Sequence, residues 1–103
     1  MSTEVEETLK RVQSHKGVEG VIIMTADGIN IKSTLSDEDT ENYCALVSQL
    51  AMKASGVVRI LDESDELAFL RVRSKKHEIM IAPDKDFVLI AVSYTHLRAH
   101  ETS

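Results

Sequence analysis

The chain has 103 residues, of which 43% are apolar and 28% are charged, and its formal net charge is −5. This length and composition are typical of one small globular domain. The negative charge argues against nucleic-acid binding through phosphate contacts, and two Tyr, two Phe and no Trp provide few rings for base stacking. A single cysteine excludes an internal disulfide and a cysteine-based zinc cage.

The first predicted element is a helix that begins near Thr3 and stops at Gly17. Thr3 and Glu6 have the spacing of a capping box, and Gly17 provides a left-handed stop. Between them, apolar residues follow at helical spacing: Val5, Leu9 and Val12. The acidic, amphipathic start differs from the basic start of a signal peptide, and no apolar run reaches membrane-spanning length. We therefore expect a cytoplasmic protein without membrane insertion.

Residues 18–34 predict a β-hairpin, because Asp27 and Gly28 separate two short apolar runs and Gly28 tolerates a positive φ. The run 21–24 is apolar throughout and does not alternate with polar residues. Since side chains of a strand point to alternate faces, this strand needs cover on both faces. The second strand is expected over 29–33.

A long helix is predicted over 37–61, with Ser36 or Asp37 as N-cap and acidic first turns that suit the helix dipole. One apolar stripe runs along its whole length: Tyr43, Val47, Leu50, Ala54, Val57 and Leu61. Mostly small residues lie beside this stripe: Cys44, Ser48, Ala51, Ser55 and Val58. Small residues let another backbone approach closely, either within the molecule or from a second copy.

Three strand-like runs follow the acidic turn 62–65, over 66–73, 77–82 and 87–92. Their connections are short and polar, which favours hairpins. The second of these runs should end at or near Ala82, because Pro83 cannot donate to a β-ladder. The last run is apolar on both faces, like the first strand of the chain, so we expect these two strands at the centre of the sheet.

The order helix, two strands, helix, three strands predicts an α+β sandwich, in which helices cover the faces of a five-stranded antiparallel sheet. The strand over 66–73 alternates Ala68, Leu70 and Val72 on one face with Leu67, Phe69, Arg71 and Arg73 on the other. If it is an edge strand, its unpaired backbone groups need a partner or a protective device. Pairing with its own copy around a two-fold axis is one solution.

The element order and three sequence runs closely resemble the roadblock-type dynein light chains. The runs are TLKRVQSHKGVEGVII, DGINIKST and FLRVRSKKHEIMIAPDKDFVLI, and the resemblance covers about residues 4 to 92. It implies a profilin-like roadblock domain over 1–92 and a homodimer in which the third strands pair and the long helices pack side by side. It further implies a non-catalytic light chain of the cytoplasmic dynein motor. Such an adaptor binds the dynein intermediate chain and helps link cargo to microtubule-based transport. Homodimer and heterodimer with a paralogue both stay open.

The resemblance and the apolar pattern together give a candidate dimer interface on the long helix and the third strand: Tyr43, Val47, Leu50, Ala51, Ala54, Leu67, Ala68, Phe69 and Leu70. A basic group follows on the chain: Arg71, Arg73, Lys75 and Lys76. It has two interpretations. It is a solvated hairpin that discourages unwanted edge pairing, or it is a contact rim for an acidic partner.

No constellation for catalysis, cofactor binding or metal binding stands out, so we expect neither an enzyme nor a cofactor. Cys44 has no local histidine partner, which favours a buried structural thiol. His96 and His100 are four residues apart but lack further ligands. Residues 93–103 have no counterpart in the family and are expected to be a non-native tail. A dimeric scaffold or regulator for small GTPases, which the wider family permits, is the alternative function.

Overall fold

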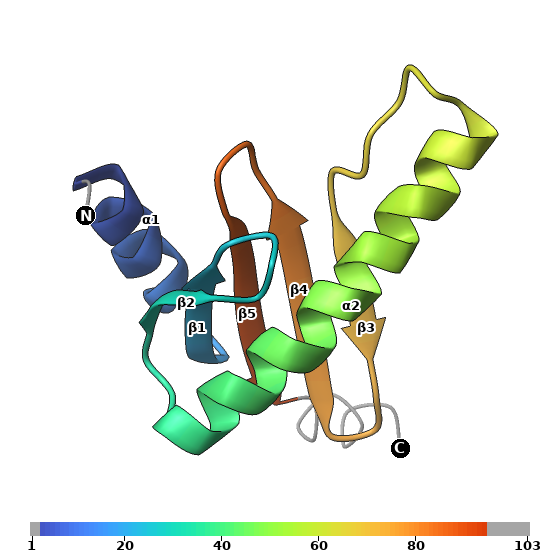
Figure 1. Cartoon of the computed structure of the whole chain (residues 1–103). Coiled ribbons are helices and arrows are strands. Elements are labelled where there is room, and N and C mark those ends of the chain that lie inside the picture. The colour runs from blue at the N-terminus through green and yellow to red at the C-terminus, as the bar shows by residue number, and fades with distance from the viewer. Residues whose placement is uncertain (1–2, 95–103) are drawn as a thin grey trace.

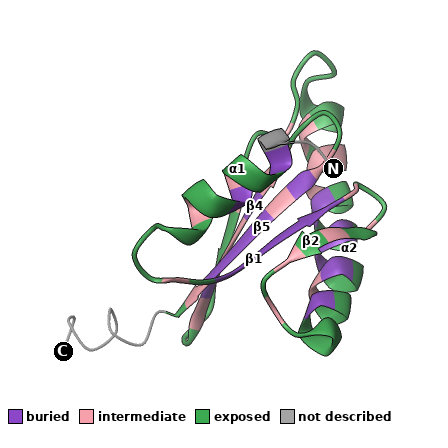
Figure 2. Cartoon of the chain, turned by 90° about the vertical axis from the view of Figure 1, so that its left-hand side faces the viewer, coloured by how far each residue is buried: buried purple, intermediate pink, exposed green. Residues whose placement is uncertain are grey.

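The computed structural model describes residues 3–94, with side chains from Val5 onward (Figure 1). The elements are α1 (Thr3–Gln13), β1 (Val18–Met24), β2 (Asn30–Ser33), α2 (Asp37–Leu61), β3 (Leu70–Arg73), β4 (His77–Pro83) and β5 (Val88–Tyr94). The strands form one antiparallel sheet in the order β2-β1-β5-β4-β3. The two helices lie on opposite faces of this sheet (Figure 2). The predicted fold class and element order are confirmed.

The continuous apolar run in β1 is explained by these two layers. Ile22 and Met24 belong to the core under α2, whereas Val21 and Ile23 pack with α1. All four side chains are 0% exposed. β1 pairs directly with β5 in the interior of the sheet, so the prediction that these two strands are central is confirmed.

α2 begins where the sequence predicts, because Ser36 caps it: the Asp39 N–H donates to Ser36 Oγ at 3.2 Å. The buried residues of α2 are mainly small: Thr40, Cys44, Val47, Ser48 and Ala51. They lie above the β-sheet core formed by residues such as Ile81 and Ile90. The small-residue side of the helix therefore packs within the molecule, and most of the larger apolar side chains are left outside this contact.

Two glycines take the backbone conformation expected of them. Gly17 has φ +90° and Gly28 has φ +93°, in the turns that precede β1 and β2. Both turn predictions rest on the absence of a Cβ, which makes a positive φ accessible. The Thr3 side chain of the predicted capping box lies outside the described side chains.

Several strand boundaries differ from the prediction, and the main differences are in the last three strands. β3 covers only Leu70–Arg73, because Leu70 pairs with Ile81 and this register places Ala68 opposite Pro83, which has no N–H. Pro83 itself pairs with Val88 and forms the last residue of β4. β5 continues through Ser93 and Tyr94, which the sequence assigned to the tail. Residues 95–103, including His96 and His100, lie outside the described residues.

Candidate functional site

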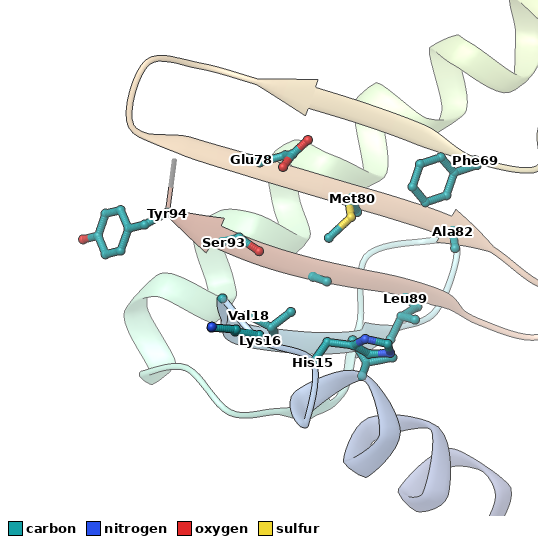
Figure 3. A pocket seen from close by; sticks show the side chains of 13 residues that line it. His15, Lys16, Val18, Phe69, Glu78, Met80, Ala82, Leu89, Ser93 and Tyr94 are labelled. Atoms are coloured by element: carbon teal, nitrogen blue, oxygen red, sulfur yellow. The ribbon is translucent and has the colours of Figure 1, made fainter. Parts of the chain in front are cut away.

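The sheet face that carries α1 is only partly covered by this short helix. α1 packs against β1, and a groove of about 410 Å³ opens between the α1–β1 turn and the strands beyond it (Figure 3). Apolar side chains form most of its lining: Val12, Val18, Phe69, Met80, Ala82, Leu89 and Ala91. The groove is therefore suited to apolar side chains of a partner.

One wall of the groove contains the buried carboxylate of a charge pair. Glu78 is 6% exposed, and its Oε2 lies 3.2 Å from Nε of Arg71. The Arg71 guanidinium also lies 5.9 Å from the centre of the Phe69 ring. A buried carboxylate without a partner is costly, so the contact with Arg71 offsets part of the cost of burying Glu78 beside apolar residues. Arg71 belongs to the basic group, and its partner Glu78 lines the groove.

The structure brings the predicted basic group together at the β3–β4 hairpin. Arg73, Lys75 and Lys76 are exposed. The turn is fixed by Ser74, whose N–H donates to the His77 carbonyl at 2.8 Å and whose Oγ accepts from the His77 N–H at 3.0 Å. Both interpretations of this group, a solvated hairpin and a contact rim, are compatible with its position beside the groove.

A second apolar surface lies on α2 beside its buried side. We call it the α2 ridge, and it consists of Leu46, Leu50, Val57, Ile60 and Leu61, with exposed fractions of 67%, 42%, 56%, 85% and 80%. Near the start of the ridge, Tyr43, Leu46 and Leu50 enclose an apolar cavity of about 220 Å³ together with Ile79 of β4. By length and composition α2 is also apolar enough to cross a membrane, but its buried side forms part of the core.

The predicted dimer-interface residues fall into two groups in the structure. Val47 and Ala51 are 5% and 7% exposed, because they form the contact between α2 and the sheet. They belong to the core of one chain and offer little surface to a second copy, which corrects their assignment to the interface. The remaining residues are half-buried or exposed: Tyr43, Leu50, Ala54, Leu67, Ala68, Phe69 and Leu70. For these seven residues, a place in the dimer interface stays a prediction.

β3 is an edge strand, since it pairs only with β4 in the described part of the chain. Leu70 packs against the core on the α2 face, whereas Phe69 lines the groove on the opposite face. The predicted alternation of side chains along this strand is therefore confirmed. Sequence reasoning missed the groove itself and two members of the α2 ridge, Leu46 and Ile60. Leu46 lies four residues before Leu50, and Ile60 lies three residues after Val57. This helical spacing was the available signal.

Two titratable groups of the described residues, Cys44 and Tyr43, have raised pKa values. Burial raises the pKa of the Cys44 thiol, which keeps it protonated and unreactive. Burial and the Asp39 carboxylate raise the pKa of Tyr43. Within residues 3–94, no group of three or more His, Cys, Asp or Glu side chains is placed to hold a metal ion.

The Roadblock/LC7 domain model matches residues 4–93. The chain belongs to the Roadblock/LC7 domain family. Its fold is similar to the Roadblock/LC7 domain of Streptomyces avermitilis, with a TM-score of 0.76, 13% identity, and coverage of 87% of this chain and 75% of that one. It is also similar to Myxococcus xanthus MglB, with a TM-score of 0.76, 15% identity, and coverage of 96% of this chain and 88% of that one. A further similar structure is MglB in a tetrameric arrangement, with a TM-score of 0.75, 11% identity, and coverage of 96% of this chain and 80% of that one.

At these identities the similar structures share the roadblock fold with this chain, and the likeness carries no more than the fold. The groove, the α2 ridge and the β3 edge are therefore the features from which a function is argued. All three are surfaces that could be covered by another polypeptide.

Proposed function

We propose that this roadblock protein is a non-catalytic, dimeric light chain of cytoplasmic dynein that binds a segment of the dynein intermediate chain. The observation that carries the binding role is that one chain leaves a sheet edge, the α2 ridge and the groove uncovered. The assignment to dynein is supported by the sequence run 69–90, whose charged turns as well as apolar strands resemble those of the dynein light chains. Its place would then be the cytoplasm, on microtubules through the motor.

A second copy is the proposed cover for the β3 edge and the α2 ridge. Figure 1 shows α2 crossing the sheet diagonally, so that its C-terminal half lies toward the β3 side. A two-fold axis beside β3 would pair the two edge strands and bring the two ridges near each other. Ile60 and Leu61 are 85% and 80% exposed, and such large apolar side chains gain most from burial.

The groove is the proposed site for the partner segment. It lies on the face opposite α2, so dimer formation through the α2 ridge would leave it open. A partner segment with apolar side chains would fill the floor, and acidic residues next to them would suit the basic group at the β3–β4 hairpin. A groove formed by a packed sheet is already in place before binding, which limits the entropy cost to ordering the partner segment.

The test is capture of purified intermediate chain by the purified chain, compared with Met80→Glu in the groove floor. We expect capture by the unmodified dimer and at least tenfold weaker capture by the Met80→Glu dimer, since a tenfold loss corresponds to about 1.4 kcal/mol. Met52→Glu is the matched control, because Met52 lies on α2 and is 67% exposed. Equal capture by all three dimers would contradict the groove as the site.

A scaffold or regulator for a small GTPase is the second candidate. The solved structures named above are MglB proteins and a bacterial Roadblock/LC7 domain, and none of these three is a dynein subunit. Mass measurement of complexes purified with the chain from cytosol separates the two candidates. Intermediate chain in the complex supports the dynein role, and a small GTPase without any dynein subunit supports the second candidate.

A further inference from the structure

Two arginines stand at the margin of the groove that lies farthest from α1. In the ladder between β3 and β4, Arg71 pairs with Met80 and Arg73 pairs with Glu78. Directly opposite residues of an antiparallel pair have their side chains on the same face of the sheet. Met80 and Glu78 line the groove, so both arginine side chains stand on the groove face. This margin of the groove is therefore basic.

Arg71 differs from its basic neighbours because two contacts hold its side chain. Its Nε lies 3.2 Å from Oε2 of Glu78, and its guanidinium carbon lies 5.9 Å from the centre of the Phe69 ring. Arg73 makes neither kind of contact within residues 3–94. The Arg71 side chain is 56% exposed, whereas that of Glu78 is 8% exposed. The pair thus joins a buried carboxylate to a guanidinium that a partner can still reach.

The chemistry of the guanidinium allows Arg71 to contact a second carboxylate while it keeps Glu78. A guanidinium carries five N–H donors in one plane, and a carboxylate accepts at most two of them side by side. The contact with Glu78 is made through Nε, on one edge of the group. The two Nη groups form another edge, which has the spacing of the two oxygens of a carboxylate.

The charges around the groove favour an acidic group at its hairpin end. Lys75 and Lys76 of the β3–β4 turn are exposed, and so is Lys16 in the turn between α1 and β1. Figure 3 shows Lys16 and Phe69 on opposite sides of Met80, so basic residues flank the groove floor from both sides. A neighbouring hollow, which shares Ala82 and Leu89 with the groove, is lined by charges of both signs: Glu7, Arg11 and Asp84.

We propose that Arg71 binds a carboxylate of the partner segment, and that Glu78 is a positioning residue that holds Arg71 for this contact. The carboxylate belongs to an Asp or Glu next to the apolar side chains that fill the groove. Both contacts of Arg71 exist before the partner arrives, so its side chain loses less freedom on binding than an unrestrained lysine would. The inference rests on the groove of the proposed function and adds the chemical group that is selected there.

Arg71→Lys tests the contact, with Arg73→Lys as the matched control on the same strand and the same face. Lysine keeps the positive charge but lacks the planar pair of donors. Capture of purified intermediate chain should become about tenfold weaker for Arg71→Lys and less than about threefold weaker for Arg73→Lys. Equal losses for the two variants would overturn the assignment to Arg71.

Glu78→Gln separates positioning from simple charge attraction. The change removes a negative charge beside the groove, so attraction alone predicts stronger capture of an acidic segment. Positioning predicts the opposite, a loss on the order of fivefold, because a neutral amide binds the guanidinium less strongly than a carboxylate does. Sedimentation and circular dichroism confirm that the variant is a folded dimer. Capture that is stronger than that of the unmodified chain would overturn the positioning role.

The Nε–H signal of Arg71 in nitrogen-15 NMR tests the positioning without any partner. In the unmodified chain this proton should exchange slowly with water, because Glu78 accepts it, and Glu78→Gln should speed the exchange. Rapid exchange in the unmodified chain would contradict the role of Glu78. A failure of the unmodified dimer to capture intermediate chain would instead contradict the proposed function.

Amide substitutions in the captured segment identify the carboxylate. Each Asp and Glu of that segment is changed in turn to Asn or Gln, and capture is measured with the unmodified chain and with Arg71→Lys. One change should weaken capture by about the same factor as Arg71→Lys and add little to it, because contacting groups are not additive. Full additivity of every amide change with Arg71→Lys would overturn the carboxylate contact.

Discussion

Close packing at single residues fixes how the elements of this roadblock domain meet. At Gly20 in β1, an added Cβ would lie 2.4 Å from Cδ2 of Leu35, in the connection between β2 and α2. Such a distance requires the Leu35 side chain or the strand to move. The sequence contains Gly20 within a predicted strand, but only the three-dimensional contact with Leu35 shows that an added side chain would displace a neighbour there.

Gly20→Ala should therefore lower the free energy of unfolding by about 1–3 kcal/mol through overpacking. Gly56→Ala is the control, because nothing lies within 4 Å of its added Cβ. The control should be neutral or stabilising by about 1 kcal/mol, since alanine is the better helix former. Urea denaturation of both variants measures the difference, and equal stability of the two would show that Leu35 does not restrict this position.

The buried thiol of Cys44 gives the protein a specific dependence on alkaline pH. Burial raises its pKa above the ordinary value of 9.0. The unfolded chain therefore releases this proton at a lower pH than the folded chain does. By linkage, the stability contributed by Cys44 is fully present below about pH 8 and falls as the pH rises through the unfolded and folded pKa values. Cys44→Ala should lose less stability between pH 8 and pH 10 than the unmodified chain loses, as followed by urea denaturation. A steeper loss in Cys44→Ala would contradict this assignment.

At the scale of the elements, α2 shows which predictions a pattern can support. The N-cap at Ser36, the acidic first turn and the length of the helix follow from local chemistry, and the structure confirms them. Which side of α2 packs on the sheet depends on how closely the helix and the sheet can approach each other. The apolar periodicity of the sequence does not contain that information. Cys44, Ser48 and Ala51 are small enough for close approach, so they are buried while the larger Leu50 is left 42% exposed.

β3 makes the same point for strands. Its alternation was predictable from period-two spacing, because Leu70 and Phe69 have to point to opposite faces. The length of β3 was not predictable from this spacing. Its first residue depends on the register with β4, which places Ala68 opposite Pro83. The groove was also beyond the sequence, since its lining joins α1, the turn that follows it and the start of β1 to Phe69, β4 and β5, which lie much later in the chain.

Leu50→Asp should weaken self-association by on the order of a hundredfold, because each buried leucine contributes about 1.5–3 kcal/mol and a dimer contains two copies. The chain itself should stay folded, since the side chain is 42% exposed in a single copy. Met52→Asp is the matched control on another side of the same helix. Sedimentation and circular dichroism measure the two effects, and a folded Leu50→Asp dimer of normal affinity would place the interface elsewhere.

For the molecule as a whole, the two faces of the sheet have separate tasks in the proposed account. The face under α2, with the α2 ridge and the β3 edge, provides contacts to a second copy. The face under α1 provides the groove and the basic hairpin for a partner segment. The sequence anticipates this division only through its excess of apolar residues on the long helix and the third strand, because the placement of grooves and edges arises from the folded topology.

Sedimentation of the unmodified chain over a wide concentration range tests the central claim most directly, which is that one copy leaves surface that a second copy covers. The account predicts a species of twice the 11.5 kDa chain mass that dissociates only on strong dilution. A compact species of 11.5 kDa at high concentration would contradict it.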